Sequence, residues 1–224
     1  RRAGVRRFIL VSTVKAVAEA SRRPLDDHTE PRPVDPYGVS KLEAERLVDA
    51  HPEATGLATT ILRLPLVYGP RMKGNMLSLF RLVDRGLPLP LGLVDNRRSL
   101  AFVGNVAGAI VAVLGAAEPP AGPCFVSDGR DLSTPELLRA IAAALGRPAR
   151  LLPVPPVLFR AAGRLGDLLS RLLPVPLTSA AVDRLLGSLA VDSSGLDRAL
   201  GYHPPYTVEE GLRLTAEWYR ETRA

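Results

Sequence analysis

Two side chains four residues apart, Tyr37 and Lys41, have the types and the spacing needed for proton transfer. On a helix, residues at this spacing share a face. A phenol has an ordinary pKa of about 10, and making it a base at neutral pH takes roughly 4 kcal/mol of stabilisation of the phenolate. One ammonium group at about 4 Å supplies about that much at an effective dielectric constant near 20. The alternative interpretation is that both side chains are simply solvated on an exposed helix.

Two hydroxyls, Ser12 and Thr13, end an apolar run over residues 8–13 that is typical of a strand buried on both faces. Parallel sheets place their ligands at the carboxyl ends of their strands. A hydroxyl at that position can hydrogen-bond a substrate oxygen while Tyr37 takes the proton. The alternative is that Ser12 and Thr13 merely terminate the strand.

The elements that must position these side chains alternate along the chain. Asp35 as N-cap and Pro36 at the first helical position predict a helix from there to Ala50. Further strands are predicted over 57–64, 100–103 and 123–127, and further helices over 75–85, 106–117, 133–146 and 207–222. Buried strands that alternate with helices indicate an α/β fold, with a parallel sheet covered by helices on both faces.

Four segments in this order resemble the landmarks of a known family: 8–13, 35–45, 62–70 and 96–103. The chain is identified by them as similar to the extended short-chain dehydrogenases/reductases, and among these to the NAD-dependent sugar-nucleotide epimerases and dehydratases. The resemblance implies the C-terminal part of a doubly wound, Rossmann-like NAD(P)-binding domain over 1–66 and about 96–130. It also implies a smaller, mostly helical substrate domain over about 67–95 and 131–224.

The resemblance implies roles for the hydroxyls and the lysine already singled out. Tyr37 matches the catalytic base, Thr13 the catalytic hydroxyl, and Lys41 the partner of the base that also bonds the nicotinamide ribose. Ser12, Tyr37, Lys41 and Pro65 are thereby expected on the cofactor side. The cofactor implied is NAD, and the residues that would select NADP instead are not recognisable in this sequence.

The substrate implied by the resemblance is a nucleotide-diphosphate sugar, contacted by Thr13, Asn75 and Arg98. Arg98 matches an arginine that clamps the diphosphate, as bidentate guanidinium–phosphate chemistry favours. Leu66 stands where the family usually has an asparagine, which removes one hydrogen bond to the substrate. A second diphosphate-binding arginine has only Arg184 as a weak match.

The function implied is that of a sugar-nucleotide 4-epimerase acting on a UDP-hexose through a 4-keto intermediate. A dehydratase would require an acid–base pair after the catalytic hydroxyl, where Val14 and Lys15 stand. The alternatives are a reductase or dehydratase of a keto-sugar or steroid-like alcohol, and a non-catalytic, truncated binding module. The family's glycine-rich phosphate loop does not occur in the sequence. We therefore expect the first half of the fold to precede Arg1, and the 224-residue chain alone to bind NAD poorly.

Composition limits the other classes of function. The net charge is +6, from 29 basic and 23 acidic residues, but the arginines are scattered in pairs without interleaved aromatic residues. That pattern argues against a nucleic-acid partner. One cysteine excludes an internal disulfide, and the three histidines lack metal-ligand spacing. No signal peptide is visible, so we expect a cytoplasmic protein, and the resemblance implies a homodimer.

The segment 151–191 is apolar, rich in proline and studded with arginine. This segment predicts a pair of helices that covers a core of the substrate domain. The alternative interpretation is a surface that contacts a membrane or a lipid-linked substrate. The longest uncharged stretch of the chain is 99–117, and its serine, asparagine and glycine residues make it too interrupted for a transmembrane segment, which needs about 20 mostly apolar residues.

Overall fold

The computed structural model describes residues 5–49, 57–170 and 178–223. The chain forms two compact units. Unit 1 comprises Arg1–Met72, Ser99–Asp131 and Leu189–Ala224, and unit 2 comprises Lys73–Arg98 and Leu132–Ser188.

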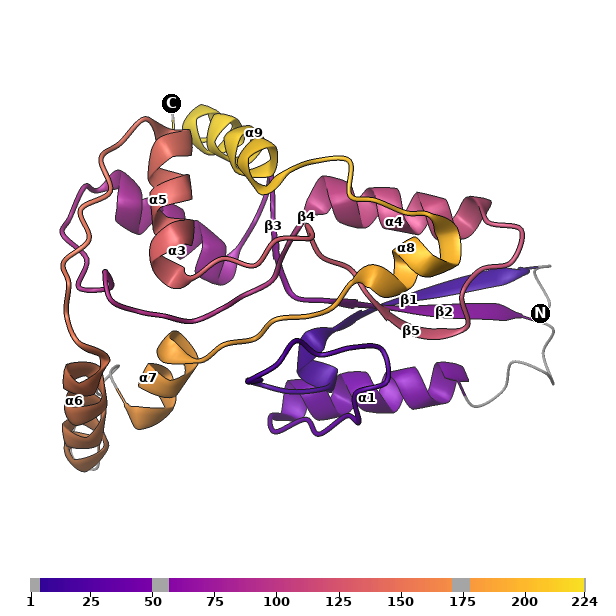
Figure 1. The fold of residues 1–224 in the computed structure, drawn as a ribbon, viewed down its shortest axis with the longest axis horizontal. Coiled ribbons are helices and arrows are strands. Elements are labelled where there is room, and N and C mark those ends of the chain that lie inside the picture. Colours follow the sequence, from indigo (N-terminus) through magenta and orange to yellow (C-terminus); the bar gives the residue numbers. More distant parts are fainter. Residues whose placement is uncertain (1–4, 50–56, 171–177, 224) are drawn as a thin grey trace. The chain divides into compact units, whose positions relative to one another are not determined.

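Unit 1 is built on parallel strands, as predicted. Strands β1 (Arg7–Thr13), β2 (Ala58–Leu64) and β5 (Gly122–Phe125) form a sheet in the order β1-β2-β5, and both neighbouring pairs are parallel (Figure 1). Strands β3 (Leu66–Tyr68) and β4 (Leu100–Phe102) form a second parallel pair. The parallel α/β fold class predicted from the sequence is confirmed.

Helices cover both faces of the three-stranded sheet, with α1 on one side and α4 and α8 on the other (Figure 1). Among the described residues, the helical elements of unit 1 are η1 (Val14–Ala16), α1 (Pro36–Asp49), α4 (Val103–Gly115), α8 (Ser194–Leu200) and α9 (Val208–Glu221). The apolar side of α4 packs with residues of β2, β4 and β5 into one core cluster. Its buried members are Leu62, Leu64, Ala101, Val106, Ala109, Val113, Cys124, Val126 and Leu196.

The first strand differs from its prediction. A strand buried on both faces is found at β2, whose last five residues are all buried, but not at β1. Phe8 and Val11 of β1 are 43 % and 42 % exposed. The physical reason is position, because β1 lies at the edge of the described sheet whereas β2 has a paired strand on each side.

The last segment of the chain also differs, because 189–224 was expected in the substrate domain and lies in unit 1. Val191 forms a parallel bridge with Leu25, and α8 packs on β5. The Tyr68 hydroxyl, at the end of β3, donates to the backbone oxygen of Val208 in α9 at 3.4 Å. These contacts attach the C-terminal helices to the sheet of unit 1.

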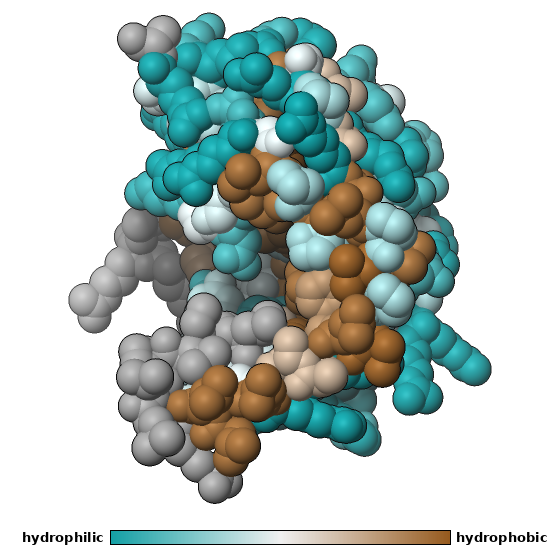
Figure 2. Space-filling model, turned by 90° about the vertical axis from the view of Figure 1, so that its left-hand side faces the viewer, coloured by the Kyte–Doolittle hydropathy of each residue, from teal (hydrophilic) through white to brown (hydrophobic). Residues whose placement is uncertain are grey.

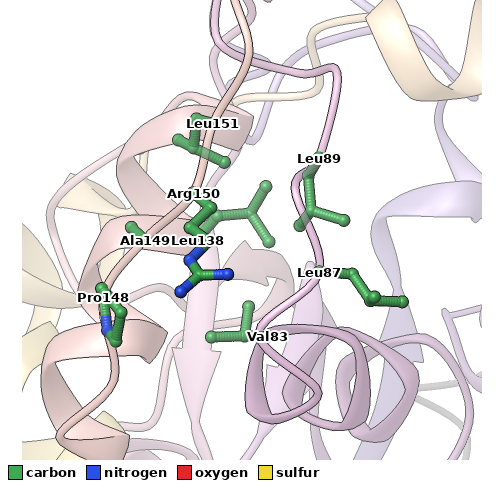
Figure 3. A pocket seen from close by; sticks show the side chains of 8 residues that line it. All are labelled: Val83, Leu87, Leu89, Leu138, Pro148, Ala149, Arg150 and Leu151. Carbon is green, nitrogen blue, oxygen red and sulfur yellow. The ribbon is translucent and has the colours of Figure 1, made fainter.

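Unit 2 is helical, with α3 (Gly74–Asp84), α5 (Thr134–Leu145), α6 (Pro156–Leu169) and α7 (Ser179–Leu186). Helix α3 packs on α5, and α6 packs on α7, so residues 151–191 contain the expected pair of helices. The prediction that this pair covers a core is not met at α6, whose large aliphatic residues are exposed. A small, mostly apolar hollow lies beside α3 and α5 (Figure 3). It is lined by Val83, Leu87, Leu89, Leu138, Pro148, Ala149, Arg150 and Leu151. No helix in the described parts of the chain is long and apolar enough to cross a membrane.

Candidate functional site

The first turn of α1 lies against the segment that follows β1. A carboxylate oxygen of Asp35 accepts a hydrogen bond from the Gly38 backbone N–H at 2.6 Å, the capping interaction expected from the sequence. A Cβ atom at Gly38 would lie 2.3 Å from the backbone oxygen of Lys15, so only glycine permits this approach. The turn that carries Tyr37 is thereby brought close to the segment that follows Thr13.

Thr13 and Pro65 lie at the same edge of the sheet. Thr13 is the last residue of β1 and is paired in register with Leu64, the last residue of β2. Pro65 follows directly and is buried. The Thr13 hydroxyl oxygen accepts from the backbone N–H of Lys15 at 3.3 Å, so its own hydrogen remains available to a ligand. The carboxyl ends of the two strands therefore gather the residues predicted from the sequence, as parallel sheets do at ligand sites.

Tyr37 and Lys41 lie together on α1, as their spacing predicts. The Tyr37 side chain is 52 % exposed, and Lys41 is half-buried beside it. The Lys41 ammonium nitrogen lies 5.8 Å from the centroid of the Tyr37 ring. A cation at this distance interacts with the ring and with any negative charge that develops on its oxygen.

The two lysines of this region have opposite electrostatic surroundings. The Lys15 ammonium lies 2.8 Å from Asp35 and 2.9 Å from Glu19. Partial burial alone would lower the pKa of Lys15, but hydrogen bonds to these two carboxylates outweigh it and the pKa is raised. Lys41 has no carboxylate partner within the described residues. Within the described residues, carboxylates therefore neutralise the positive charge of Lys15 but not that of Lys41.

A buried polar network lies beneath α1. Glu45 of α1 and Arg63 of β2 form an ion pair, with 2.7 Å between Arg63 Nη2 and Glu45 Oε2, and both side chains are 4 % exposed. Arg63 Nε donates to both carboxylate oxygens at 3.2 Å. The Ser12 hydroxyl donates to Glu45 Oε1. Ser12 therefore ties β1 to α1 within the protein, and its expected cofactor contact stays a prediction.

Sequence reasoning did not single out this network. A signal was present, because Arg63 stands inside the apolar run of β2, where an unpaired charge would be unstable. To be stable there, the Arg63 guanidinium requires a carboxylate from a neighbouring helix or strand. Glu45 lies one helical turn after Lys41, and its burial fixes the rotation of α1 about its axis. The network thus positions the helix face that carries Tyr37 and Lys41.

The predicted substrate residues belong to unit 2. Asn75 is exposed at the second position of α3. The Arg98 backbone N–H donates to the Leu132 oxygen at 2.9 Å. Its guanidinium donates to the backbone oxygens of Arg184 and of Gly187, the latter at 3.1 Å. Arg98 therefore reaches the C-terminal end of α7, where Arg184 also lies, so the two candidate diphosphate-binding arginines are neighbours.

Comparison with known proteins shows the family to which the chain belongs. The model of the NAD dependent epimerase/dehydratase family matches residues 1–124. A UDP-glucose 4-epimerase from Vibrio cholerae is 38 % identical over 217 residues, which are 96 % of this chain and 63 % of the relative. A 2-alkyl-3-oxoalkanoate reductase from Stenotrophomonas maltophilia is 31 % identical over 192 residues, 80 % of this chain and 56 % of the relative.

Among solved structures, the UDP-glucose 4-epimerase of Thermus thermophilus in complex with NAD superposes with a TM-score of 0.69 at 27 % identity. The match covers 98 % of this chain and 65 % of that chain. The chain thus spans 63 % and 56 % of the length of the two curated relatives and 65 % of the solved structure. The NAD bound in the Thermus structure and the description of the matched family agree with the predicted cofactor.

Proposed function

We propose that this chain, which belongs to the NAD dependent epimerase/dehydratase family, contributes the catalytic tyrosine and the substrate-binding residues of a sugar-nucleotide 4-epimerase. One observation carries the proposal. Tyr37 and Lys41 share a face of α1 at the carboxyl ends of parallel strands, and the lysine has no acid beside it among the described residues. A tyrosine and an uncompensated ammonium in this position suit the removal of a proton from an alcohol.

Tyr37 is the proposed general base. Its half-exposed side chain, as the phenolate, accepts the proton of the sugar 4-hydroxyl and becomes the phenol, and the positive charge of Lys41 favours the phenolate that this step requires. Thr13 donates its free hydroxyl hydrogen to the same substrate oxygen. After the 4-keto sugar has turned over in the site, Tyr37 returns the proton to the same sugar oxygen and the 4-hydroxyl re-forms.

The residues at the sheet edge fit a nicotinamide cofactor. Lys41 has donors to spare for a ribose hydroxyl, and buried Pro65 offers an apolar wall at the end of β2. NAD, when bound, would accept a hydride from the sugar carbon and return it to the opposite face. The roles of Lys41 and Pro65 are to hold and orient the cofactor and to exclude water.

The proposed substrate is a UDP-hexose. Arg98 and Arg184 of unit 2 bind its diphosphate, because guanidinium groups pair with phosphate oxygens in a bidentate manner. Arg98 is already oriented by its bonds to the carbonyl oxygens at the end of α7. Asn75, exposed in the first turn of α3, adds an amide donor.

The second candidate function is an NAD(P)-dependent reductase of a keto-sugar or another ketone. The 31 % identity to a 2-alkyl-3-oxoalkanoate reductase favours it, and the same tyrosine and lysine would then give a proton to a carbonyl oxygen instead of taking one. The two functions differ in whether the reaction consumes the reduced cofactor. An epimerase regenerates its cofactor in each turnover, whereas a reductase consumes one NAD(P)H for each ketone.

The test is to incubate the full-length gene product with UDP-galactose and catalytic NAD, and to follow both UDP-glucose and absorbance of NADH. We expect UDP-glucose to accumulate over many turnovers without net NADH. Net formation of NADH in proportion to product would contradict the epimerase and favour the reductase. A matched preparation with Lys41→Met, which keeps the length of the side chain but removes its charge, should lose most of the activity.

A further inference from the structure

Helix α6 of unit 2 packs through its smallest residues. Gly163 and Gly166 are its buried positions, and the helix packs on α7 at Gly163. A Cβ atom at Gly163 would lie 3.1 Å from the Cα atom of Ser179 and 3.0 Å from Cγ2 of Val182. The backbones of α6 and α7 therefore approach more closely than larger side chains would allow.

The large aliphatic residues of α6 point to solvent. At about 100° per residue they occupy one stripe about 120° wide, on the side away from the two glycines. The members of this apolar stripe are Val157 (62 % exposed), Leu158 (57 %), Leu165 (57 %), Leu168 (60 %) and Leu169 (42 %). Figure 2 shows hydrophobic side chains gathered in a brown patch at the bottom of the view, over α6. An ordinary surface helix turns such residues inward, so an exposed stripe marks a contact with something else.

Basic residues border this apolar stripe. Arg160 and Arg164 are exposed, lie one turn apart next to the stripe, and have no carboxylate partner among the described residues. The single acid of α6, Asp167, accepts a hydrogen bond from the backbone N–H of Ser179 at 2.9 Å. The border of the stripe thus presents positive charge.

The charge of the whole chain is concentrated in the same unit. Unit 2 has 12 basic and 5 acidic residues, a net charge of +7, whereas unit 1 has 17 and 18, a net charge of −1. The two sets add up to the 29 and 23 of the full sequence. A second copy of this chain would bring a second unit with a net charge of +7, so charge disfavours self-association through unit 2. The complementary partner is an anionic surface.

We propose that α6 is a membrane-surface helix that lies in the interface of an anionic phospholipid bilayer. Its apolar stripe enters the boundary between headgroups and acyl chains, and Arg160 and Arg164 contact lipid phosphates. The helix has 14 residues, about 21 Å at 1.5 Å per residue, so it lies on the bilayer and does not cross it. This surface is independent of the reaction catalysed in unit 1 and goes beyond the proposed function.

The test is flotation of the full-length gene product with phosphatidylcholine vesicles that contain about 30 mol % phosphatidylglycerol, compared with vesicles of phosphatidylcholine alone. We expect the protein to float with the anionic vesicles only. Raising the salt from about 0.1 M to about 0.5 M should weaken the binding, because screening acts on exposed charges.

Two double variants separate the apolar and the charged contributions. Leu165→Ser/Leu168→Ser should weaken vesicle binding about 100-fold, because two aliphatic side chains no longer leave water. Arg160→Gln/Arg164→Gln should weaken it about 30-fold, and only for anionic vesicles. The matched control is Leu47→Ser/Val111→Ser, which changes two exposed aliphatic residues on helices of unit 1 (77 % and 67 % exposed) and should float like the unaltered protein.

Several results would overturn the proposal. It fails if the unaltered protein does not float, if it floats equally with neutral vesicles, or if Leu165→Ser/Leu168→Ser floats as well as the unaltered protein. A second copy, instead of a membrane, covers the stripe if sedimentation shows a dimer that this variant converts to a monomer while neither form floats. Thermal unfolding followed by circular dichroism should be the same for all variants, because every substituted side chain is exposed.

Discussion

Helices α1 and α6, both drawn in Figure 1, have the same length, 14 residues, and differ in the residues that they bury. The buried positions of α1 are Gly38, Leu42 and the charged Glu45, whereas those of α6 are two glycines, with Phe159 half-buried on the same side. Outside, α1 presents Tyr37 and α6 presents leucines. Each helix departs in one respect from the ordinary arrangement, because α1 buries a charge and α6 exposes its large aliphatic residues.

The two helices differ in whether other residues of the protein stabilise their unusual side chains. The buried charge on α1 is matched by Arg63 and by the Ser12 hydroxyl, so the desolvation of Glu45 is offset within the protein. The exposed leucines on α6 have no such compensation in the described part of the chain. We infer that α1 is adapted to hold chemistry in place, and that α6 is adapted to a partner outside the protein.

The largest expected effect on stability comes from removing the buried charge of Glu45. Glu45→Gln should lower the free energy of unfolding by about 3–5 kcal/mol, because it leaves the buried Arg63 charge without its partner. Urea unfolding followed by circular dichroism measures the change. Glu43→Gln, two residues away on the exposed face of the same helix, is the control and should stay within about 0.5 kcal/mol. Equal effects of the two substitutions would refute the account of α1.

A smaller effect is expected where α6 meets α7. Gly163→Ala should destabilise the protein by about 1–3 kcal/mol, because the new Cβ would press on the backbone of Ser179. The control is Gly115→Ala at the end of α4, where a Cβ meets nothing within 4 Å. That change should leave stability unaltered or raise it by up to about 1 kcal/mol. If Gly163→Ala were neutral, the orientation described for α6 would be wrong.

A second buried acid, Asp128, extends the comparison, because no arginine pairs with it in the described part of the chain. Burial raises the pKa of Asp128 and outweighs its hydrogen bonds from the Phe102 N–H and from Asn105. The folded state therefore holds the Asp128 proton more tightly than the unfolded state does. The unfolding free energy of the unaltered protein, relative to Asp128→Asn, should fall as the pH rises from about 4 through the raised pKa.

Asp192 provides a control of opposite sign. Hydrogen bonds from Ser194 lower the pKa of Asp192, so this carboxylate stabilises the fold above the unfolded pKa and the stabilisation is lost as the pH falls. The unfolding free energy relative to Asp192→Asn should therefore rise with pH. Urea titrations at several pH values measure both differences, and slopes of the same sign would contradict these assignments.

The smallest expected effect is on the exposed leucines. Leu165→Ser/Leu168→Ser should change the free energy of unfolding by less than about 0.5 kcal/mol, because both side chains are more than half exposed. Urea unfolding without vesicles is the measurement. A loss of several kcal/mol would mean that these leucines pack within the protein.

The sequence predicted local features more reliably than long-range ones. Asp35 and Pro36 predicted the start of α1, and the capping bond to Gly38 confirms it. Pairing between Glu45 and Arg63, 18 residues apart, was not predicted, because a charge in a strand does not identify its partner. Partial exposure of β1 was also missed, since an apolar run does not reveal whether a strand is at the edge of its sheet.

For the candidate site, spacing alone placed Tyr37 beside Lys41, because four residues on a helix fix a common face. The surroundings of the charges could not be predicted in the same way. Lys15 and Lys41 are the same residue type, yet only Lys15 is held by carboxylates in the described structure. That distinction depends on Asp35 and Glu19 folding toward one lysine, which is a property of the tertiary structure.

The central claim is that Tyr37 is the base of an epimerase. The most direct test is the turnover of UDP-galactose to UDP-glucose by Tyr37→Phe in the full-length gene product, at saturating substrate and NAD. We expect the turnover number to fall by at least about 100-fold while urea unfolding is unchanged, since the residue is half exposed. Tyr206→Phe, another tyrosine with an exposed side chain, should keep full activity. Undiminished turnover in Tyr37→Phe would contradict the claim.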